Sequence, residues 1–259
     1  MSYKPYPYIG PIDPDFPSDL GDLTTDDTLT WDGSEWDFFT TSGGPFPILT
    51  WQCAVFADDP LWTPPADGGA VSSWRDGSGN GRNLTQATGG SRPTYRAAGI
   101  ATGRASVQGD GGDHLAASFT GSSQPVSIVV IGKSPSSGCC LAVAGGSNAP
   151  FVGVNGTSNW RLFSGGSQPT FGTYTTSPVL VGGVINGASS KGIENDSVTT
   201  GLSTGTTASN GFALFSRPEG DSWNSGHIGF AGLYNGDITA DAGWPDFLAW
   251  ASAYYSLGF

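Results

Sequence analysis

Charged residues are scarce in this chain, and their balance argues against one class of partner. Only 12% of the 259 residues are Asp, Glu, Lys or Arg, and 10 basic against 22 acidic residues give a formal net charge of -12. Because a nucleic-acid backbone is bound through clustered Lys and Arg, we expect no nucleic acid as a partner. The acidity instead favours solubility.

Cysteine and long apolar runs are also scarce. Cys53, Cys139 and Cys140 fit neither a disulfide framework nor a zinc-ligand spacing, so we interpret them as small apolar fillers and leave their pairing open. No run of about 18 apolar residues predicts a membrane span. The first ten residues lack the basic start and apolar core of a signal peptide, so we expect synthesis and assembly in a cytoplasm.

Glycine and proline are abundant, with 41 and 18 residues, and they limit helix content. Short β-prone runs bounded by Gly, Ser, Asn or Pro occur at Val126–Ile131, Leu141–Ala144, Phe151–Val154, Trp160–Phe163, Val179–Ile185, Phe212–Phe215 and Ile228–Tyr234. Many short strands predict a sandwich of two antiparallel sheets around one main core.

The C-terminus is the exception to this strand pattern. Apolar residues recur there at helical spacing, Pro245 suits a first helical turn and Gly258 follows the end; the apolar positions are Trp244, Phe247, Leu248, Ala251, Tyr254 and Tyr255. We therefore predict an all-β sandwich closed by a short helix.

Residues 1–28 form a segment rich in proline and aromatic residues. Because proline favours extended backbone, we predict an extended docking arm, with a disordered tail as the alternative; its aromatic docking residues are Tyr3, Tyr6, Tyr8 and Phe16. Residues 29–44 carry two short β-prone runs around Asp32-Gly33, which predict a small hairpin and linker. That hairpin would display Trp31, Trp36, Phe38 and Phe39 to a larger assembly.

Two sets of residues carry a resemblance to a known family. LTWDGSEW (29–36) resembles an element of bacteriophage tail and virion proteins. Residues 45–259 resemble the concanavalin A-like, laminin-G-like jelly roll of such proteins through VSSWRDGSGNGRNLTQ (71–86), RPTYRAAGI (92–100), SVQGDGGDHL (106–115), LVGGVINGASSKGIENDSVTTG (180–201) and GHIGFAGLYNGDITADAGWPDFLAWASAYYSLGF (226–259). The resemblance implies attachment to a virion, with a trimer as the expected oligomer.

Few residues are candidates for a metal or for catalysis. Asp76, Ser78 and Asn80 match the first half of a calcium loop, but Ala87 stands where a bidentate Glu is needed, so a turn held by side-chain-to-backbone hydrogen bonds is favoured and no cofactor is expected. Asp110, Asp113 and His114 are interpreted as a tight turn with a partly exposed histidine. The only glutamates, Glu35, Glu194 and Glu219, lack the paired spacing of a β-glucanase, so we predict no enzyme.

Binding to glycans remains as the alternative to catalysis. Asn159 with Trp160, and Trp223 with Asn224, pair an indole with an amide near predicted loop edges and are the candidate carbohydrate-binding residues, although a core role for each Trp is favoured. Our hypothesis is a non-enzymatic bacteriophage virion protein, a minor tail, fibre or head-decoration component that contacts other virion proteins and is a candidate for binding host surface glycans. The alternatives are a free carbohydrate-binding module and a glycan-cleaving enzyme.

Overall fold

The chain divides into two compact units, Met1–Pro45 and Phe46–Phe259. A computed structural model describes residues 28–31, 36–39, 49–100, 103–133, 140–145, 148–155, 158–216 and 225–259. The predicted arm, including Tyr3, Tyr6, Tyr8 and Phe16, lies outside the described residues, so its docking role stays a prediction.

The first unit contains the predicted hairpin. Strand β1 (Thr28–Trp31) pairs antiparallel with β2 (Trp36–Phe39), and Trp31 lies opposite Trp36. The hairpin prediction is confirmed for the backbone. The side chains of Trp31, Trp36, Phe38 and Phe39 are outside the described part, and their contact with an assembly remains a prediction.

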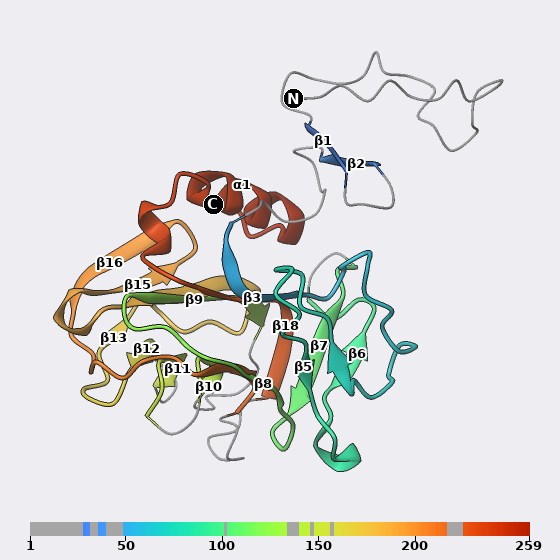
Figure 1. The fold of residues 1–259 in the computed structure, drawn as a ribbon, viewed down its shortest axis with the longest axis horizontal. Helices are drawn as coiled ribbons and strands as arrows, with labels where there is room; N and C mark the ends of the chain where they lie inside the picture. The colour runs from blue at the N-terminus through green and yellow to red at the C-terminus, as the bar shows by residue number, and fades with distance from the viewer. Residues whose placement is uncertain are drawn as a thin grey trace. The chain divides into compact units, whose positions relative to one another are not determined.

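The second unit is a sandwich of two antiparallel sheets (Figure 1). In sheet 1 the strand order is β13 (Thr170–Phe171), β12 (Asn159–Phe163), β11 (Phe151–Asn155), β10 (Cys140–Val143), β17 (Gly211–Leu214), β8 (Leu115–Ser118), β5 (Leu84–Thr85) and β4 (Ser73–Trp74). In sheet 2 it is β16 (Ser197–Leu202), β15 (Ser190–Glu194), β14 (Val179–Ile185), β9 (Val126–Lys133), β18 (Ser225–Tyr234), β7 (Ser106–Asp110) and β6 (Thr94–Arg96), and β3 (Trp51–Phe56) also pairs with β18. The predicted all-β sandwich is confirmed.

Short helical turns join some of these strands, and one α-helix follows the last. The 3₁₀ turns are η2 (Gly89–Ser91), η3 (Gly187–Ser189) and η4 (Ile238–Ala240), and the helix α1 spans Trp244–Tyr255. Pro245 lies in the first turn of α1, as expected, but the left-handed residue that ends the helix is Ser256, with φ of 54°, rather than Gly258. In the described part, no helix is long and apolar enough to cross a membrane.

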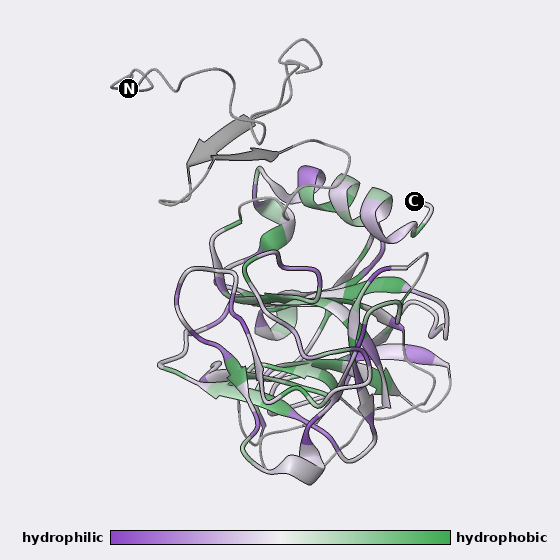
Figure 2. Cartoon of the chain, turned by 90° about the vertical axis from the view of Figure 1, so that its right-hand side faces the viewer, coloured by the Kyte–Doolittle hydropathy of each residue, from purple (hydrophilic) through white to green (hydrophobic). Residues whose placement is uncertain are grey.

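The central strands β9 and β14 of sheet 2 are buried on both faces, which explains why β9 is apolar along nearly its whole length. Val126, Ile128 and Val130 belong to the core between the sheets, whereas Val129 and Ile131 face a second core under α1. Figure 2 shows the apolar strands in layers, with α1 beside them. The helix therefore supplies the outer cover that sheet 2 needs.

Aromatic rings join α1 to this outer face. The fully buried ring of Phe247 lies 5.5 Å from Trp51 and 5.2 Å from Phe230, centroid to centroid. We expect Phe247→Ala to lower the free energy of unfolding by about 3–5 kcal/mol, because it removes a buried ring and leaves a cavity. Urea unfolding of the full chain measures this.

Leu248→Ala is the matched control, since Leu248 lies on the same helix and is only partly buried. Leu248→Ala should lower the free energy of unfolding by no more than about half of the loss expected for Phe247→Ala. Equal losses for the two variants would contradict the account of α1 as an apolar cover.

Candidate functional site

Trp160, a candidate carbohydrate-binding residue for which a core role was favoured, is a core residue. Its side chain is 0% exposed, and its indole Nε1 donates to Glu194 Oε1 at 3.2 Å. Asn159 Nδ2 donates to the carbonyl of Gly172 at 2.7 Å. The ring of Trp160 has no face left for a sugar, so the core role favoured for this residue is confirmed. Trp223 and Asn224 lie outside the described residues.

Asp76 organises a turn, as favoured from the sequence. Its Oδ1 accepts from the backbone N–H of Ala54 at 3.0 Å and of Ser78 at 2.9 Å, and its Oδ2 accepts from Arg82 at 2.8 Å. Asn80 Nδ2 donates to the Trp51 carbonyl at 2.9 Å. The turn interpretation is confirmed, and the carboxylate oxygens that calcium would need are already engaged by N–H groups.

Asp110, Asp113 and His114 lie at the turn that joins β7 to β8, as predicted. Asp113 is 5% exposed, and burial, with a further contribution from the Asp110 carboxylate, raises the pKa of Asp113 to about 6. Burial also lowers the pKa of His114, whose ring nitrogens lie 2.8 and 3.1 Å from Gln86 Nε2. Among the described residues, no group of three or more His, Cys, Asp or Glu is placed to hold a metal ion.

A cavity that the sequence did not predict lies beside β4, at the edge of sheet 1. It has a volume of about 470 Å³ and is lined by an aromatic ring, two prolines and several polar side chains: Trp62, Thr63, Pro64, Pro65, Ala70, Ser72, Ser73, Arg75 and Asn83. We call it the Trp62 cavity. The residues come from the loop after β3 and from β4 and the start of β5.

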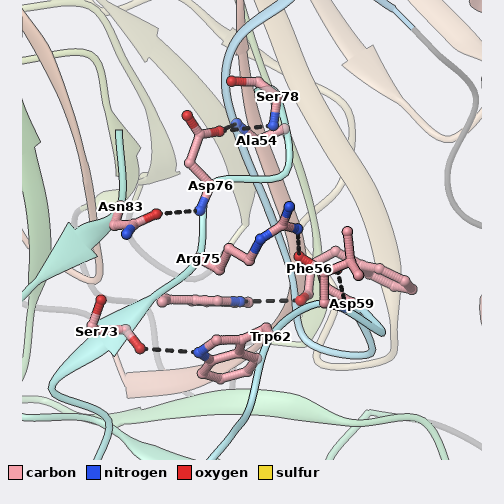
Figure 3. Close-up of polar contacts among 11 residues, drawn as sticks. Ala54, Phe56, Asp59, Trp62, Ser73, Arg75, Asp76, Ser78 and Asn83 are labelled. Carbon is pink, nitrogen blue, oxygen red and sulfur yellow. Dashed lines mark hydrogen bonds and ion pairs between the residues drawn. The ribbon is translucent and has the colours of Figure 1, made fainter. Parts of the chain in front are cut away.

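Trp62 is held by the core beneath it. Its half-buried indole stacks on the fully buried Trp74, with centroids 5.7 Å apart and an interplanar angle of 27°, and meets Tyr95 edge-on at 5.8 Å. Its Nε1 donates to the Ser73 carbonyl at 3.2 Å (Figure 3). Trp74 is itself fixed, because its Nε1 donates to the Phe56 carbonyl at 3.1 Å. The cavity therefore has a rigid aromatic wall.

An ion pair shapes the loop that carries Trp62. Arg75 Nη1 lies 2.6 Å from Asp59 Oδ2, and the Asp59 side chain is 6% exposed against 34% for Arg75. Asp59 Oδ1 accepts from the Leu61 N–H at 2.9 Å, and its carbonyl accepts from the Trp62 N–H at 3.0 Å. Asp59 thus fixes both the loop and one nitrogen of the Arg75 guanidinium (Figure 3), and Arg75 lines the cavity.

Asn83 adds a hydrogen-bond donor to the same cavity. Its Oδ1 accepts from the Asp76 N–H at 2.9 Å, which orients the amide. Among the described residues its Nδ2 has no hydrogen-bond acceptor, and the neighbouring Ser72 and Ser73 are exposed. A fixed indole face beside free N–H and O–H groups is an arrangement that can stack on an apolar sugar face and bond its hydroxyls.

Comparison with known proteins gives matches among solved structures alone. No family model matches the chain, and no curated protein matches it. A GH54 α-L-arabinofuranosidase mutant aligns at 13% identity and TM-score 0.53, over 82% of this chain and 60% of that chain. Domain 4 of AbnA, a GH43 extracellular arabinanase from Geobacillus stearothermophilus in complex with arabinotriose, aligns at 15% identity and TM-score 0.52, over 77% of this chain and 98% of that domain.

A sialidase from Trypanosoma rangeli in complex with sialic acid aligns at 10% identity and TM-score 0.51, over 83% of this chain and 34% of that chain. At these identities the likeness shows the fold alone, a β-sandwich. The chain spans about 60% of the arabinofuranosidase and about a third of the sialidase, and nearly all of the arabinanase domain.

These matches correct one prediction. The sequence led us to predict that the chain is not an enzyme, and matches to an arabinofuranosidase, an arabinanase and a sialidase contradict that prediction. The error arose from testing the sequence against the carboxylate motif of one type of glycosidase. The resemblance to bacteriophage virion proteins is not tested by these matches and stays a prediction.

The buried carboxyl of Asp113 gives a pH prediction. In the folded chain this group holds its proton up to about pH 6, whereas its ordinary pKa is 3.8. Between these values the folded state binds more protons than the unfolded state, so the free energy of unfolding should fall as the pH rises from about 4 to about 6. Asp113→Asn should abolish this fall and raise stability at pH 7 by about 1–3 kcal/mol.

Urea unfolding between pH 4 and pH 7 measures this effect. The amide can still accept the Asp110 N–H that Asp113 Oδ2 accepts at 3.0 Å. Asp196→Asn, which removes one negative charge from an exposed turn, is the charge-matched control. If the free energy of unfolding depends on pH in the same way in the Asp113→Asn variant and in the unaltered chain, the raised pKa of Asp113 would be refuted.

Proposed function

We propose that the second unit binds a glycan and that the Trp62 cavity holds the sugar. The observation that carries this proposal is the half-buried Trp62 ring, fixed against Trp74 and facing a cavity of about 470 Å³ with polar side chains around it. This volume lies within the range of about 300–1,000 Å³ that is usual for small-molecule sites.

The chemistry of the wall suits a neutral sugar. One side of a sugar ring presents C–H groups, which pack against an indole face, while its hydroxyls require donors and acceptors. Trp62 supplies the face, and Arg75, Asn83 and the exposed serines supply the polar groups. Because Pro64 and Pro65 restrict the loop, little conformational entropy is lost when a ligand binds.

The match to a single domain supports the choice of first probe. The chain covers 98% of domain 4 of the arabinanase AbnA, which was solved in complex with arabinotriose. We therefore propose a short neutral oligosaccharide as the ligand class and arabinotriose as the first compound to test. A weak single site, with a dissociation constant near 1 mM, corresponds to about -4 kcal/mol.

We expect Trp62→Ala to weaken arabinotriose binding to the full chain at least about tenfold, or about 1.4 kcal/mol, because it removes the stacking face. Isothermal titration calorimetry measures the affinity. Leu61→Ala is the matched control: Leu61 is the neighbouring residue, is 50% exposed and does not line the cavity, so its loss should leave the affinity within about twofold.

Asn83→Asp tests the site without removing a packed ring. The new carboxylate can still accept the Asp76 N–H but has no N–H to donate, so binding should weaken while thermal stability is retained. A glycan array on the full chain extends the test to other sugars, and release of reducing ends from each bound glycan measures hydrolysis. Absence of glycan binding, or binding unaffected by both the Trp62→Ala and Asn83→Asp changes, would overturn the proposal.

A further inference from the structure

A second cavity, of about 350 Å³, lies at sheet 2 and is lined by two cationic side chains and a histidine. Its lining includes Arg96 on β6, Lys133 at the end of β9 and His227 near the start of β18, with Asp67 from the loop before β4. We call it the His227 cavity. None of these residues was a predicted site residue.

Strand register brings the three basic side chains together. Lys133 lies opposite His227, His227 lies opposite Gln108, and Arg96 lies opposite Ser106, two residues before Gln108. Residues opposite each other, and residues two apart on one strand, share a face of a sheet. The intervening Val107 and the following Ile228 belong to the core between the sheets, so the basic residues occupy the outer face.

Arg96 and Lys133, the two cationic side chains of this cavity, form no ion pair with a carboxylate of the described residues. Within the described part of the chain, ion pairs join Arg75 to Asp59 and Lys191 to Asp237, and neither Arg96 nor Lys133 takes part in one.

Neutral groups orient these cations instead. Arg96 Nε donates to Gln108 Oε1 at 2.7 Å, and Lys133 Nζ donates to the Ile100 carbonyl at 3.5 Å. Asp67 Oδ1 accepts the Ala97 N–H at 2.9 Å. Arg96 and Lys133 outnumber the one carboxylate of the lining, that of Asp67, so in a chain with a net charge of -12 this cavity keeps a local positive charge suited to an anion.

His227 completes the lining. Its Nδ1 lies 3.0 Å from the hydroxyl of the fully buried Ser106, so Nε2 is the ring nitrogen left for a ligand. The backbone at Gly99 closes the Nδ1 side, because a Cβ there would lie 1.8 Å from Ser106 Oγ and 2.8 Å from Nδ1. Burial, followed by the charges of Lys133 and Arg96, lowers the pKa of His227 to about 4.

We propose that Arg96, Lys133 and His227 form a binding site for one oxyanion group, a carboxylate or a sulfate. The guanidinium has nitrogens beyond Nε to offer, the ammonium has further N–H groups, and both gain from a desolvated negative partner. This site is separate from the Trp62 cavity and does not depend on sugar binding there. An acidic sugar and a free inorganic anion share the required chemistry, and the experiment distinguishes them.

The test follows the imidazole signals of the full chain by NMR. The chain has two histidines, so His114 serves as an internal reference, because burial lowers its pKa without a contribution from a cation. A bound anion offsets the charges of Lys133 and Arg96, so sulfate or glucuronate should raise the pKa of His227 by about 1 and leave that of His114 unchanged. Glucose, the neutral counterpart of glucuronate, should have no effect.

Variants make the test specific. Lys133→Gln and Arg96→Gln should each raise the pKa of His227 without any added anion, because each removes a repelling charge, and each should reduce the response to anion. Lys191→Gln removes a cation that is paired with Asp237 at 2.7 Å and should retain the full response. Backbone amide spectra establish that each variant is folded.

Each outcome of the titration either assigns the site to one class of anion or overturns the proposal. A response to glucuronate assigns the site to an acidic sugar, and a response to sulfate alone assigns it to an inorganic anion or a sulfate ester. Equal shifts of His227 and His114 would indicate ionic strength alone and would overturn the proposal. The proposal would also be overturned if added anion raised the pKa of His227 as much in the Arg96→Gln and Lys133→Gln variants as in the unaltered chain.

Discussion

The stacking of Trp62 on Trp74 is the contact on which the proposed glycan site depends. Trp74 is fully buried between the sheets, and its Nε1 is held by the carbonyl of Phe56 at the end of β3. Trp62 lies on top of it and lines the surface cavity. An aromatic pair of this kind contributes about 0.5–1.5 kcal/mol beyond the area that it buries, enough to keep a loop ring in one orientation. The ion pair of Asp59 with Arg75 then sets the path of the loop.

The architecture explains why surface sites occur where they do. The inner faces of both sheets pack on each other, and α1 covers part of the outer face of sheet 2. The Trp62 cavity lies at the edge strand β4 of sheet 1, and the His227 cavity involves the ends of β6, β9 and β18 in sheet 2. One cavity has an aromatic wall and the other a basic one, so they suit different parts of a ligand or different ligands.

The sequence predicted the elements better than the sites. Runs such as Val179–Ile185 and the apolar spacing of α1 follow from local periodicity, which is why strands, hairpin and helix were predicted. Trp160 was a candidate for sugar binding because its neighbour Asn159 suggested a loop edge, and β12 places its ring in the core, the role that was favoured. The sequence DDPLWTPP places Trp62 in a Pro-rich loop, which is a signal for an exposed aromatic residue. The sequence does not show that the ring is fixed, because its stacking partner Trp74 is brought beside it only by the fold. Lys133 and His227 meet through strand register, which local sequence does not encode.

Fluorine NMR of the full chain labelled with 5-fluorotryptophan tests the central claim most directly. The chain has nine tryptophans, and the signal of Trp62 is assigned by its disappearance in a Trp62→Phe variant. Addition of an oligosaccharide that binds should shift the Trp62 signal strongly and leave that of the buried Trp160 in place. A glycan that binds while the Trp62 signal stays fixed would contradict the assignment of the site.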